Sequence, residues 1–293
     1  MSNLSRIQCA VDFSDASLAA FEYGLALAKA QSAELSLVFA VPLDVRFNWR
    51  ARERMDLLAE LRRVTIAEGV PVSVNVQQGD PAEVILLHTR ARKPDALVIG
   101  THGRIGMERF RRGSVATRVV QGAPCPTFVV RAFPSDRRVE RFGRFDRILC
   151  ATDFSAASGA ALNQAIDLIR RGKRLTLLHV LRRPPFLYAR RPWNFVHTDA
   201  WPRIHQIVSS LSPDLREKVH PRLSEGRVAK EILRVAADTR ADLIVVGVPV
   251  RRGVYKWFGS TAARILRASK VPVLAVPELA RLRTSEETHR QTA

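Results

Sequence analysis

The strongest constraint on the fold of this chain is that one pattern occurs in it twice. The segment "RIQCAVDFSDASLAAFEYGLALA", starting at Arg6, matches "RILCATDFSAASGAALNQAIDLI", starting at Arg147. Further along, "PDALVIG", ending at Gly100, matches "ADLIVVG", ending at Gly247, and "CPTFVV" matches "VPVLAV". Because each copy has the length of an ordinary domain, the repeat predicts two domains with the same fold.

The boundaries follow from where the similarity stops. The first domain is expected at residues 1–133 and the second at 145–278. The segment between them, 134–144, is polar and charged and has no periodicity, so it is interpreted as a linker. Residues 279–293 contain few large apolar side chains, and we expect the end of this tail to be disordered.

Within each copy, short apolar runs bounded by turn residues alternate with helical patterns. In the first copy, Leu18, Phe21 and Leu25 recur at helical spacing, as do Val84 and Leu87. Continuous apolar strands between amphipathic helices predict a parallel sheet covered on both faces. Each copy should therefore be a doubly wound α/β domain with a five-stranded, mostly parallel sheet. The predicted strands are 7–11, 34–41, 70–76, 95–100 and 126–130, then 147–152, 175–180, 218–223, 242–247 and 271–276.

The second helical region of the second copy differs from that of the first. Residues 182–214 contain prolines at 184, 185, 192, 202 and 213, so any helix there should be short. The two tryptophans of this segment are expected to pack over the core; a partner or ligand surface is the alternative.

Composition limits the partners and the location. The formal net charge is +19 at pH 7 and arginine predominates, which suits phosphate or nucleic acid. The basic residues are nevertheless spread along the chain, so we do not expect nucleic acid to be the main partner. No apolar run reaches the roughly 18 residues of a membrane span, and the N-terminus lacks the layout of a signal peptide. We expect a cytoplasmic protein without membrane association.

The three cysteines form no CxxC pair, which fits a reducing compartment. Cys9 and Cys150 occupy equivalent positions in the first strand of each copy and are expected in the core. Cys125 lies between two prolines and could be partly exposed.

Candidate binding residues of the first copy collect at the carboxyl ends of its strands, where parallel sheets bind ligands. Asp12 follows the first strand, with Ser14 or Asp15 placed to cap the next helix, and Val41 ends the second strand. A glycine segment follows the fourth strand and leads into a helix from Val115. Its glycines and serine are Gly100, Gly103, Gly113 and Ser114.

Glycines before a helix N-terminus favour an anion, because backbone N–H groups can approach it closely. The spacing fits neither a Walker A loop nor the Rossmann fingerprint. Two plain alternatives remain at this point: the glycines form only a turn and helix cap, and Asp12 is only a capping carboxylate.

The stretch "VIGTHGRIGMERFRRGSVATRVVQGAPCPTFVV", together with "AVDFSDAS", closely resembles the universal stress protein family, whose nucleotide-binding members carry Gly-x(2)-Gly-x(9)-Gly-(Ser/Thr). The resemblance extends over nearly the whole chain. It implies a tandem member with an adenine-nucleotide alpha-hydrolase-like, Rossmann-like fold and bound ATP, with or without Mg²⁺. It further implies that the last strands of the two copies pair as an internal pseudo-dimer; the same pairing could join two chains in a homodimer.

The resemblance also assigns roles. Asp12 and the backbone around Val41 would meet the adenine. Gly100, Gly103, Gly113 and Ser114 would surround the ribose and phosphates, with the Val115 amide nearby. Arg104 could reach a phosphate, or it could be solvated.

The second copy departs from this motif. Val250 replaces the middle glycine, and only eight residues separate Val250 from Gly259, whereas nine separate Gly103 from Gly113. A β-branched residue resists the backbone conformation that glycine permits. A weaker second site is therefore expected, at Asp153, Val180, Gly247, Gly259, Ser260 and Thr261.

No catalytic acid–base pair and no metal-ligand spacing of histidines or cysteines is found in the sequence. The sequence thus predicts an ATP-binding stress-response protein that binds nucleotide mainly in its first domain and hydrolyses ATP slowly at most. The alternative is an interaction module that does not bind nucleotide and acts through its basic surface on nucleic acid, another polyanion or a protein.

Overall fold

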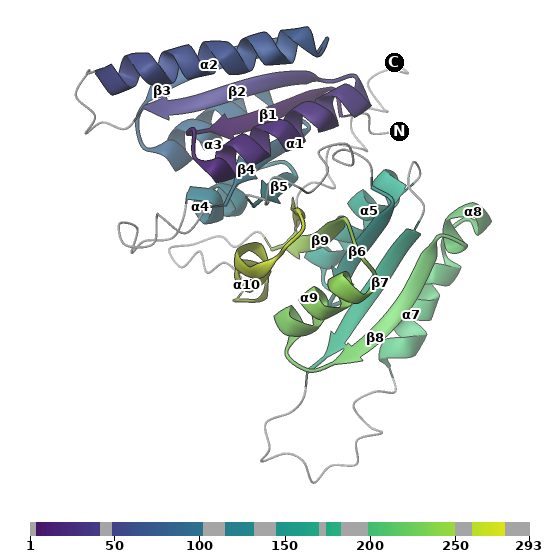
Figure 1. Cartoon of the computed structure of the whole chain (residues 1–293). Helices are drawn as coiled ribbons and strands as arrows, with labels where there is room; N and C mark the ends of the chain where they lie inside the picture. The colour runs from purple at the N-terminus through teal and green to yellow at the C-terminus, as the bar shows by residue number, and fades with distance from the viewer. Residues whose placement is uncertain are drawn as a thin grey trace, which may run out of the picture. The chain divides into compact units, whose positions relative to one another are not determined.

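The computed structural model of the chain contains two compact units, one within Met1–Arg144 and one of Phe145–Glu278 (Figure 1). The predicted linker, 134–144, and the predicted tail, 279–293, lie outside the residues that the structure describes. The described residues are 4–41, 49–101, 115–131, 145–169, 174–182, 199–249 and 260–278.

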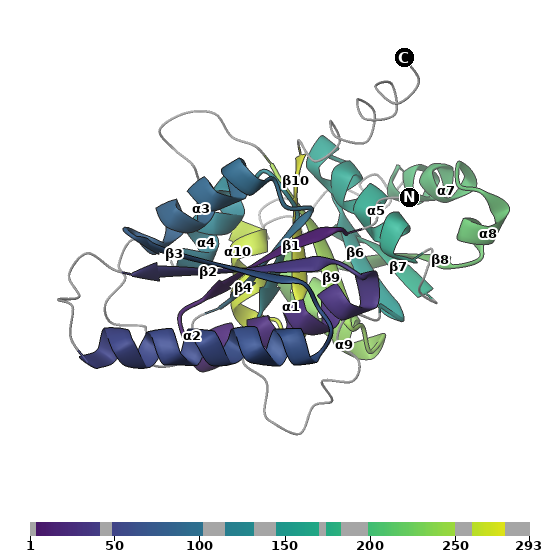
Figure 2. The ribbon, with the colours of Figure 1, turned by 90° about the horizontal axis from the view of Figure 1, so that it is seen from above.

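The first unit has five parallel strands in the order β3-β2-β1-β4-β5. Figure 2 shows α1 and α2 on one face of this sheet and α3 and α4 on the other. The predicted doubly wound α/β class is confirmed. The elements are β1 (Arg6–Val11), α1 (Asp15–Gln31), β2 (Glu34–Val41), α2 (Trp49–Ala67), β3 (Val72–Gln78), α3 (Pro81–Arg92), β4 (Ala96–Gly100), α4 (Val115–Gly122) and β5 (Thr127–Val130).

The strand order places a crevice beyond the carboxyl end of β1. This strand pairs with β2 on one side and with β4 on the other, so the direction in which the chain adds strands reverses there. In such a sheet the connections on the two sides of β1 leave to opposite faces, which leaves the strand end uncovered. Val11, the last residue of β1, lies opposite Phe39 of β2.

The strands next to this crevice are buried because they are covered on both faces. All of β1 after Arg6 is buried, as are the four residues of β5 and all but the last residue of β4. Cys9 and Cys150 are fully buried, as expected. Cys125 is also buried, with 3% of its surface exposed, so the expectation of partial exposure is wrong.

The second unit repeats the arrangement with the strand order β10-β9-β6-β7-β8, all described pairs being parallel. Its β8 contains Pro221, which an edge strand tolerates because one side of it needs no hydrogen bonds. The elements are β6 (Arg147–Thr152), α5 (Ala156–Ile169), β7 (Arg174–Leu181), α7 (Ala200–Ser209), α8 (Pro213–Arg216), β8 (Val219–Glu225), α9 (Val228–Asp238), β9 (Leu243–Val248), α10 (Ser260–Ala268) and β10 (Val273–Pro277).

The helix that follows the second strand is short in this unit, as the prolines predicted: α7 has 10 residues, whereas α2 has 19. Trp201 on α7 is 43% exposed and does not pack over the core as expected; its ring lies 5.1 Å from that of His205. Trp193 lies outside the described residues. None of the helices in the described ranges combines the length and apolar composition that a bilayer-crossing segment needs.

Candidate functional site

The turn after β1 is held by a short network of polar side chains. The Asp12 carboxylate accepts hydrogen bonds from the backbone N–H of Ser14 (3.0 Å) and from its hydroxyl (2.6 Å). The Ser14 side chain in turn accepts from the backbone N–H of Ser17 and caps α1. Of the two predicted caps, Ser14 and Asp15, it is Ser14 that performs this role.

Between Asp12 and Ser14, Phe13 adopts a left-handed backbone conformation with φ of 65°. A non-glycine residue there costs about 1–3 kcal/mol and tends to occur at functional sites. The Phe13 ring meets the Phe39 ring edge-on, with 5.2 Å between centroids and 63° between planes. The strained turn thus presents an aromatic ring at the strand end of the crevice.

A cavity of about 230 Å³ opens at this edge of the sheet. It is walled by the ends of three strands and by residues of all four helices of the unit. Its lining residues are Ala10, Val11, Asp12, Ser14, Ser17, Val38, Phe39, Ala40, Arg54, Pro81, Ile85, Ile99, Gly100, Thr101 and Val115.

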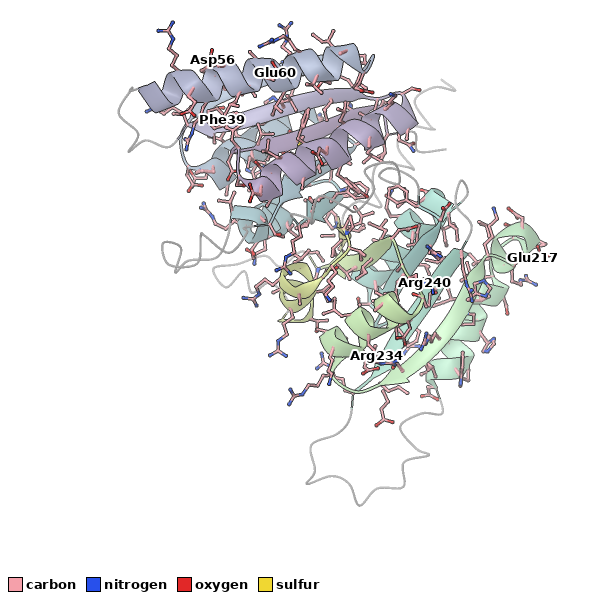
Figure 3. The ribbon with its side chains drawn as sticks, in the orientation of Figure 1. Phe39, Asp56, Glu60, Glu217, Arg234 and Arg240 are labelled. Carbon is pink, nitrogen blue, oxygen red and sulfur yellow. The ribbon has the colours of Figure 1, made fainter. Side chains whose placement is uncertain are left out.

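The walls of this cavity are mostly apolar, with few polar groups. Figure 3 labels Phe39, which is buried near the tip of β2. Among the described lining residues, Asp12 is the one acidic side chain and Arg54 the one basic side chain. An apolar slot with a few convergent polar groups is typical of a small-molecule site.

Three of the residues singled out in the sequence line this cavity: Asp12, Gly100 and Val115. Val41 is not among the lining residues, whereas its neighbour Ala40 is; the Val41 carbonyl accepts a hydrogen bond from the Gly79 N–H (2.9 Å). The remaining candidates of the first copy lie outside the described residues: Gly103, Arg104, Gly113 and Ser114.

Gly100 is required for packing, whatever the cavity holds. A Cβ atom there would lie 2.7 Å from the backbone nitrogen of Ser17 and closer still to the carbonyl group of Ala16. The first turn of α1 therefore passes directly over the end of β4. Gly247 in the second unit has the same relation to Ala157 and Ser158 of α5. Its presence in the second copy therefore follows from the fold and carries no information about a ligand.

Two cavity residues were missed in the sequence. Phe39 was read only as part of a strand, although the register that pairs it with Val11 makes it a strand-end residue. Arg54 lies one helical turn before Leu58, which is buried. That spacing is the sequence signal for Arg54, but it is ambiguous in the sequence, because the adjacent Leu57, which is 44% exposed, could equally have faced the sheet.

The second unit repeats the polar turn after β6. Asp153 accepts from the Ser155 backbone N–H (3.1 Å) and hydroxyl (2.5 Å), and Phe154 has φ of 63°. Burial raises the pKa of the Asp153 carboxyl, but these hydrogen bonds outweigh burial and leave the pKa below its usual value. Asp12 and Asp153 therefore have the same structural role.

The strand end itself differs between the units. His179, which the register places where the first unit has Phe39, lies with its Nδ1 2.8 Å from the Thr152 carbonyl oxygen. Its ring packs on that of Phe154, with 4.5 Å between centroids and 31° between planes. The guanidinium of Arg203, from α7, lies 4.4 Å from the centroid of the Phe154 ring. In this unit, aromatic and cationic side chains of the protein stack on one another at the strand end.

Of the second-copy candidates, Asp153 holds the turn and Gly247 lies in β9. Val180 is buried and corresponds by register to Ala40, so Leu181 is the counterpart of Val41. The Leu181 carbonyl accepts from Gly226 N–H, as that of Val41 does from Gly79. Ser260 and Thr261 begin α10, and Gly259 and Val250 lie outside the described residues.

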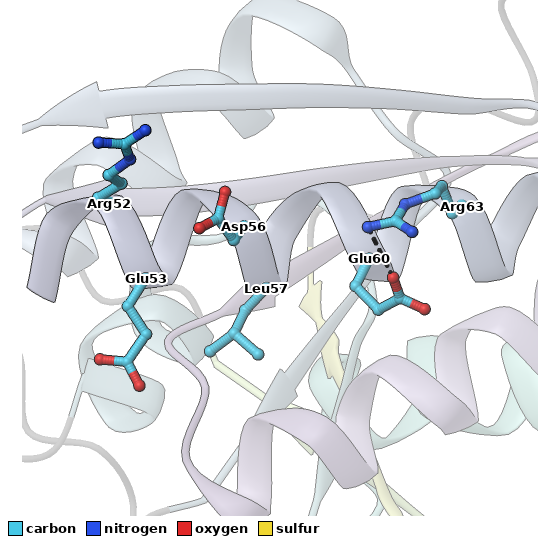
Figure 4. A pocket seen from close by; sticks show the side chains of 6 residues that line it. All are labelled: Arg52, Glu53, Asp56, Leu57, Glu60 and Arg63. Carbon is cyan, nitrogen blue, oxygen red and sulfur yellow. Dashed lines mark ion pairs between the residues drawn. The ribbon is translucent and has the colours of Figure 1, made fainter.

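A second hollow, of about 460 Å³, lies along the outer surface of α2 (Figure 4). All of its lining residues are exposed and come from this one helix, and Arg63 and Glu60 pair across it at 2.9 Å. A single helix surface cannot enclose a ligand, so this hollow is interpreted as a solvated charged face. Within the described ranges, no cluster of three or more histidine, cysteine or acidic side chains is arranged to hold a metal ion.

Comparison with known proteins finds the same family in each of the two copies. The model of the universal stress protein family matches residues 3–131 and 144–277. A universal stress protein of Methanocaldococcus jannaschii is 30% identical over 138 residues, which are 43% of this chain and 81% of that protein.

Solved structures agree on the fold. A universal stress protein from Archaeoglobus fulgidus covers 95% of this chain and 100% of its own, with a TM-score of 0.71 and 22% identity. One universal stress protein was solved in complex with cAMP; it has 21% identity and a TM-score of 0.37, and it covers 45% of this chain and 100% of its own. A family protein from Arabidopsis thaliana was solved with AMP bound; it has 22% identity and a TM-score of 0.34, and it covers 45% of this chain and 97% of its own. The chain therefore belongs to the universal stress protein family, of which it carries two domains in tandem.

Proposed function

We propose that this protein binds an adenine nucleotide, ATP in particular, in its first domain, and that its second domain supports the first without a full nucleotide site. Under this proposal the base enters the cavity at the end of β1. The phosphates extend toward the start of α4 and the glycine segment. Any hydrolysis of ATP is slow, and stress-responsive signalling would follow from nucleotide occupancy.

The observation that carries the proposal is the position of the two ends of the glycine segment. Gly100, its first glycine, and Val115, the residue after its Gly-Ser pair, both line the cavity at the end of β1. A helix N-terminus offers unpaired N–H groups and a partial positive charge to an anion. An apolar slot next to such a terminus suits a base linked to phosphates.

The difference between the domains supports one main site rather than two. In the first unit, Phe13 and Phe39 meet edge-on beside the cavity. In the second unit, His179, Phe154 and Arg203 stack together at the corresponding strand end. In the second copy, Val250 in place of the middle glycine and the shorter spacing of the motif also favour a single main site.

The first test is calorimetric titration of ATP, with and without Mg²⁺, into the wild type and into Gly103→Val, which copies the residue at position 250. We expect binding by the wild type and its loss in the variant, because the branched side chain would occupy the space of the ligand. No heat of binding in the wild type would refute the proposal.

The matched pair Asp12→Ala and Asp153→Ala controls for a general loss of stability. Both carboxylates hold a serine cap in the same way, so both variants should lose similar stability. Only Asp12→Ala should weaken ATP binding. An equal loss of affinity in both would show that the effect acts through the stability of the chain and not through contact between Asp12 and the nucleotide.

The pairing of the two last strands, Thr127–Val130 and Val273–Pro277, is also a proposal, resting on the family resemblance. It would protect two sheet edges from unwanted pairing. Amide exchange in both strands should then be as slow as in β1, and fast exchange in either would contradict the pairing.

A further inference from the structure

One arginine of α2 differs from the others in its orientation. Leu58 is 2% exposed and Thr65 is fully buried, so these residues mark the side of α2 that packs on the sheet. Arg54, one turn before Leu58, lies on the same side and is half-buried, whereas Arg52 and Arg63 are exposed on the outer face drawn in Figure 4. Arg54 is thus directed toward the cavity and not toward solvent.

Arg54 lines the cavity together with Phe39 and Ala40, at the end of β2. Within the described ranges it makes no hydrogen bond, ion pair or ring contact, whereas the exposed Arg63 pairs with Glu60. A half-buried guanidinium beside apolar walls can gain from a ligand that offers it a π face.

In the second unit, an arginine of the corresponding helix lies on an aromatic ring of the protein. Arg203 comes from α7, the helix that likewise follows the second strand, and it lies over the Phe154 ring at 4.4 Å. The other neighbour of that ring is the imidazole of His179, at 4.5 Å. There the planar cation has a π partner supplied by the protein itself.

We propose that Arg54 covers the base of the nucleotide in the first domain, with its guanidinium stacked on the face of the purine ring. The inference rests on the proposed function and deepens it. Arginine suits this role because its guanidinium is planar, always charged and stacks on π faces. In the second domain, the guanidinium of Arg203 already lies over the Phe154 ring.

The location separates this role from phosphate binding. Arg54, on α2, lines the cavity beside the end of β2, whereas the start of α4, which would hold phosphate, follows β4 in the chain. In the sheet, strand β1 lies between β2 and β4. The contribution of Arg54 should therefore be the same for every ligand that carries the base, whatever its number of phosphates.

The test is calorimetry with adenosine, AMP and ATP on the wild type, Arg54→Ala and Arg54→Lys, with circular dichroism as the check on folding. Arg54→Ala should weaken all three ligands by a similar factor, about two- to thirtyfold, the range of a partly desolvated cation–π contact. Arg54→Lys should lose less, because the charge stays while the planar stacking is lost.

Two matched variants serve as controls. Arg52→Ala removes an exposed arginine from the same helix, and Arg203→Ala removes the stacked arginine of the second domain; both should leave affinity unchanged. If Arg54→Ala weakened the binding of AMP and ATP but not of adenosine, the side chain would be assigned to phosphate binding and the inference would be overturned.

Other outcomes separate the two proposals. Unchanged affinity in Arg54→Ala, with normal binding by the wild type, would overturn the role of Arg54 and leave the proposed function standing. No binding by the wild type would overturn both.

Discussion

Gly100 shows that one residue of a binding motif can be required by the fold itself. The first turn of α1 crosses the end of β4 so closely that no side chain fits, and α5 crosses β9 at Gly247 in the same way. The motif glycine therefore recurs in the second copy although the middle glycine does not. Presence of Gly247 alone is no argument for a second nucleotide site.

A substitution series tests this packing. Gly100→Ala and Gly247→Ala should each lower the free energy of unfolding by about 1–3 kcal/mol, the usual cost of overpacking, because backbone atoms must move to admit the methyl group. Gly159→Ala is the control: Gly159 lies in α5 with no atom within 4 Å of an added Cβ, so it should stabilise by about 0.5–1 kcal/mol. Urea unfolding measures all three. Stability of Gly100→Ala equal to that of the wild type would contradict the close approach.

Asp242 introduces a pH dependence of stability. Its carboxylate accepts the backbone N–H groups of Asp146 (2.9 Å) and Arg147 (3.0 Å), yet burial raises its pKa to about 6. An unfolded aspartate titrates near pH 3.9. Between these values the folded state binds the proton more tightly, so the contribution of Asp242 to the free energy of unfolding decreases as the pH rises from about 4 to about 6.

Asp242→Asn should abolish this decrease, because the amide does not titrate and its oxygen can still accept both N–H groups. The measurement is the difference in unfolding free energy between wild type and variant across that pH range. Carboxylates with lowered pKa, such as Asp80, are common to both proteins and cancel in the difference. A difference that stays constant with pH would contradict the raised pKa.

At the scale of elements, periodicity located the helices but not always their buried faces. Phe21 and Val84 are buried as the spacing predicted, whereas Leu18 is 36% and Leu87 is 55% exposed. The face of α1 on the sheet consists mostly of small residues, among them Gly24, whose added Cβ would touch Cys9, Leu35 and Val98 at ordinary contact distance. Hydrophobicity alone does not reveal such a face, because close approach of a helix to a sheet selects small side chains over apolar ones.

The join between α3 and α4 depends on Asp80. Its side chain caps α3 by accepting from the Glu83 N–H (3.1 Å), and it pairs with Arg118 of α4 at 2.8 Å. The hydrogen bond from Arg118 is the main cause that lowers the pKa of this carboxyl. Both helices carry cavity residues, Pro81 and Val115.

Two substitutions separate the roles of Asp80. Asp80→Asn keeps the cap and loses the ion pair, which should cost about 0.2–1 kcal/mol because the pair is partly exposed. Asp80→Ala loses both and should cost about 1 kcal/mol more. Thermal unfolding checks the order, and Arg118→Ala should match Asp80→Asn. Equal costs for the two Asp80 variants would mean that the cap contributes nothing.

At the scale of the whole molecule, two units of one fold differ in their strand ends. The proposed single nucleotide site in two domains predicts that ligand stabilises only part of the chain. The net charge of +19 is compatible with this, because it raises the local concentration of anionic ligands without specifying one.

ATP at a free concentration of 100 times its dissociation constant should raise the unfolding free energy of the first domain by about 2.7 kcal/mol. The second domain should be unaffected. Hydrogen exchange measured peptide by peptide should therefore slow in β1 to β4 and stay unchanged in β6 to β9, and Gly103→Val should abolish the change. Equal slowing in both units would indicate a second site or cooperative unfolding of the whole chain.

The amino-acid sequence was sufficient to predict the two copies, the ten strands, the α/β class and the edge of the sheet at which the candidate site lies. These follow from repetition and local periodicity, which can be read along the chain. Three-dimensional contacts were needed to show that Gly100 is a packing residue, that Cys125 is buried, and that Phe39 and Arg54 line the cavity. Those properties depend on which residues meet across strands and helices, and the distance between two side chains in space is not a property of their spacing in sequence.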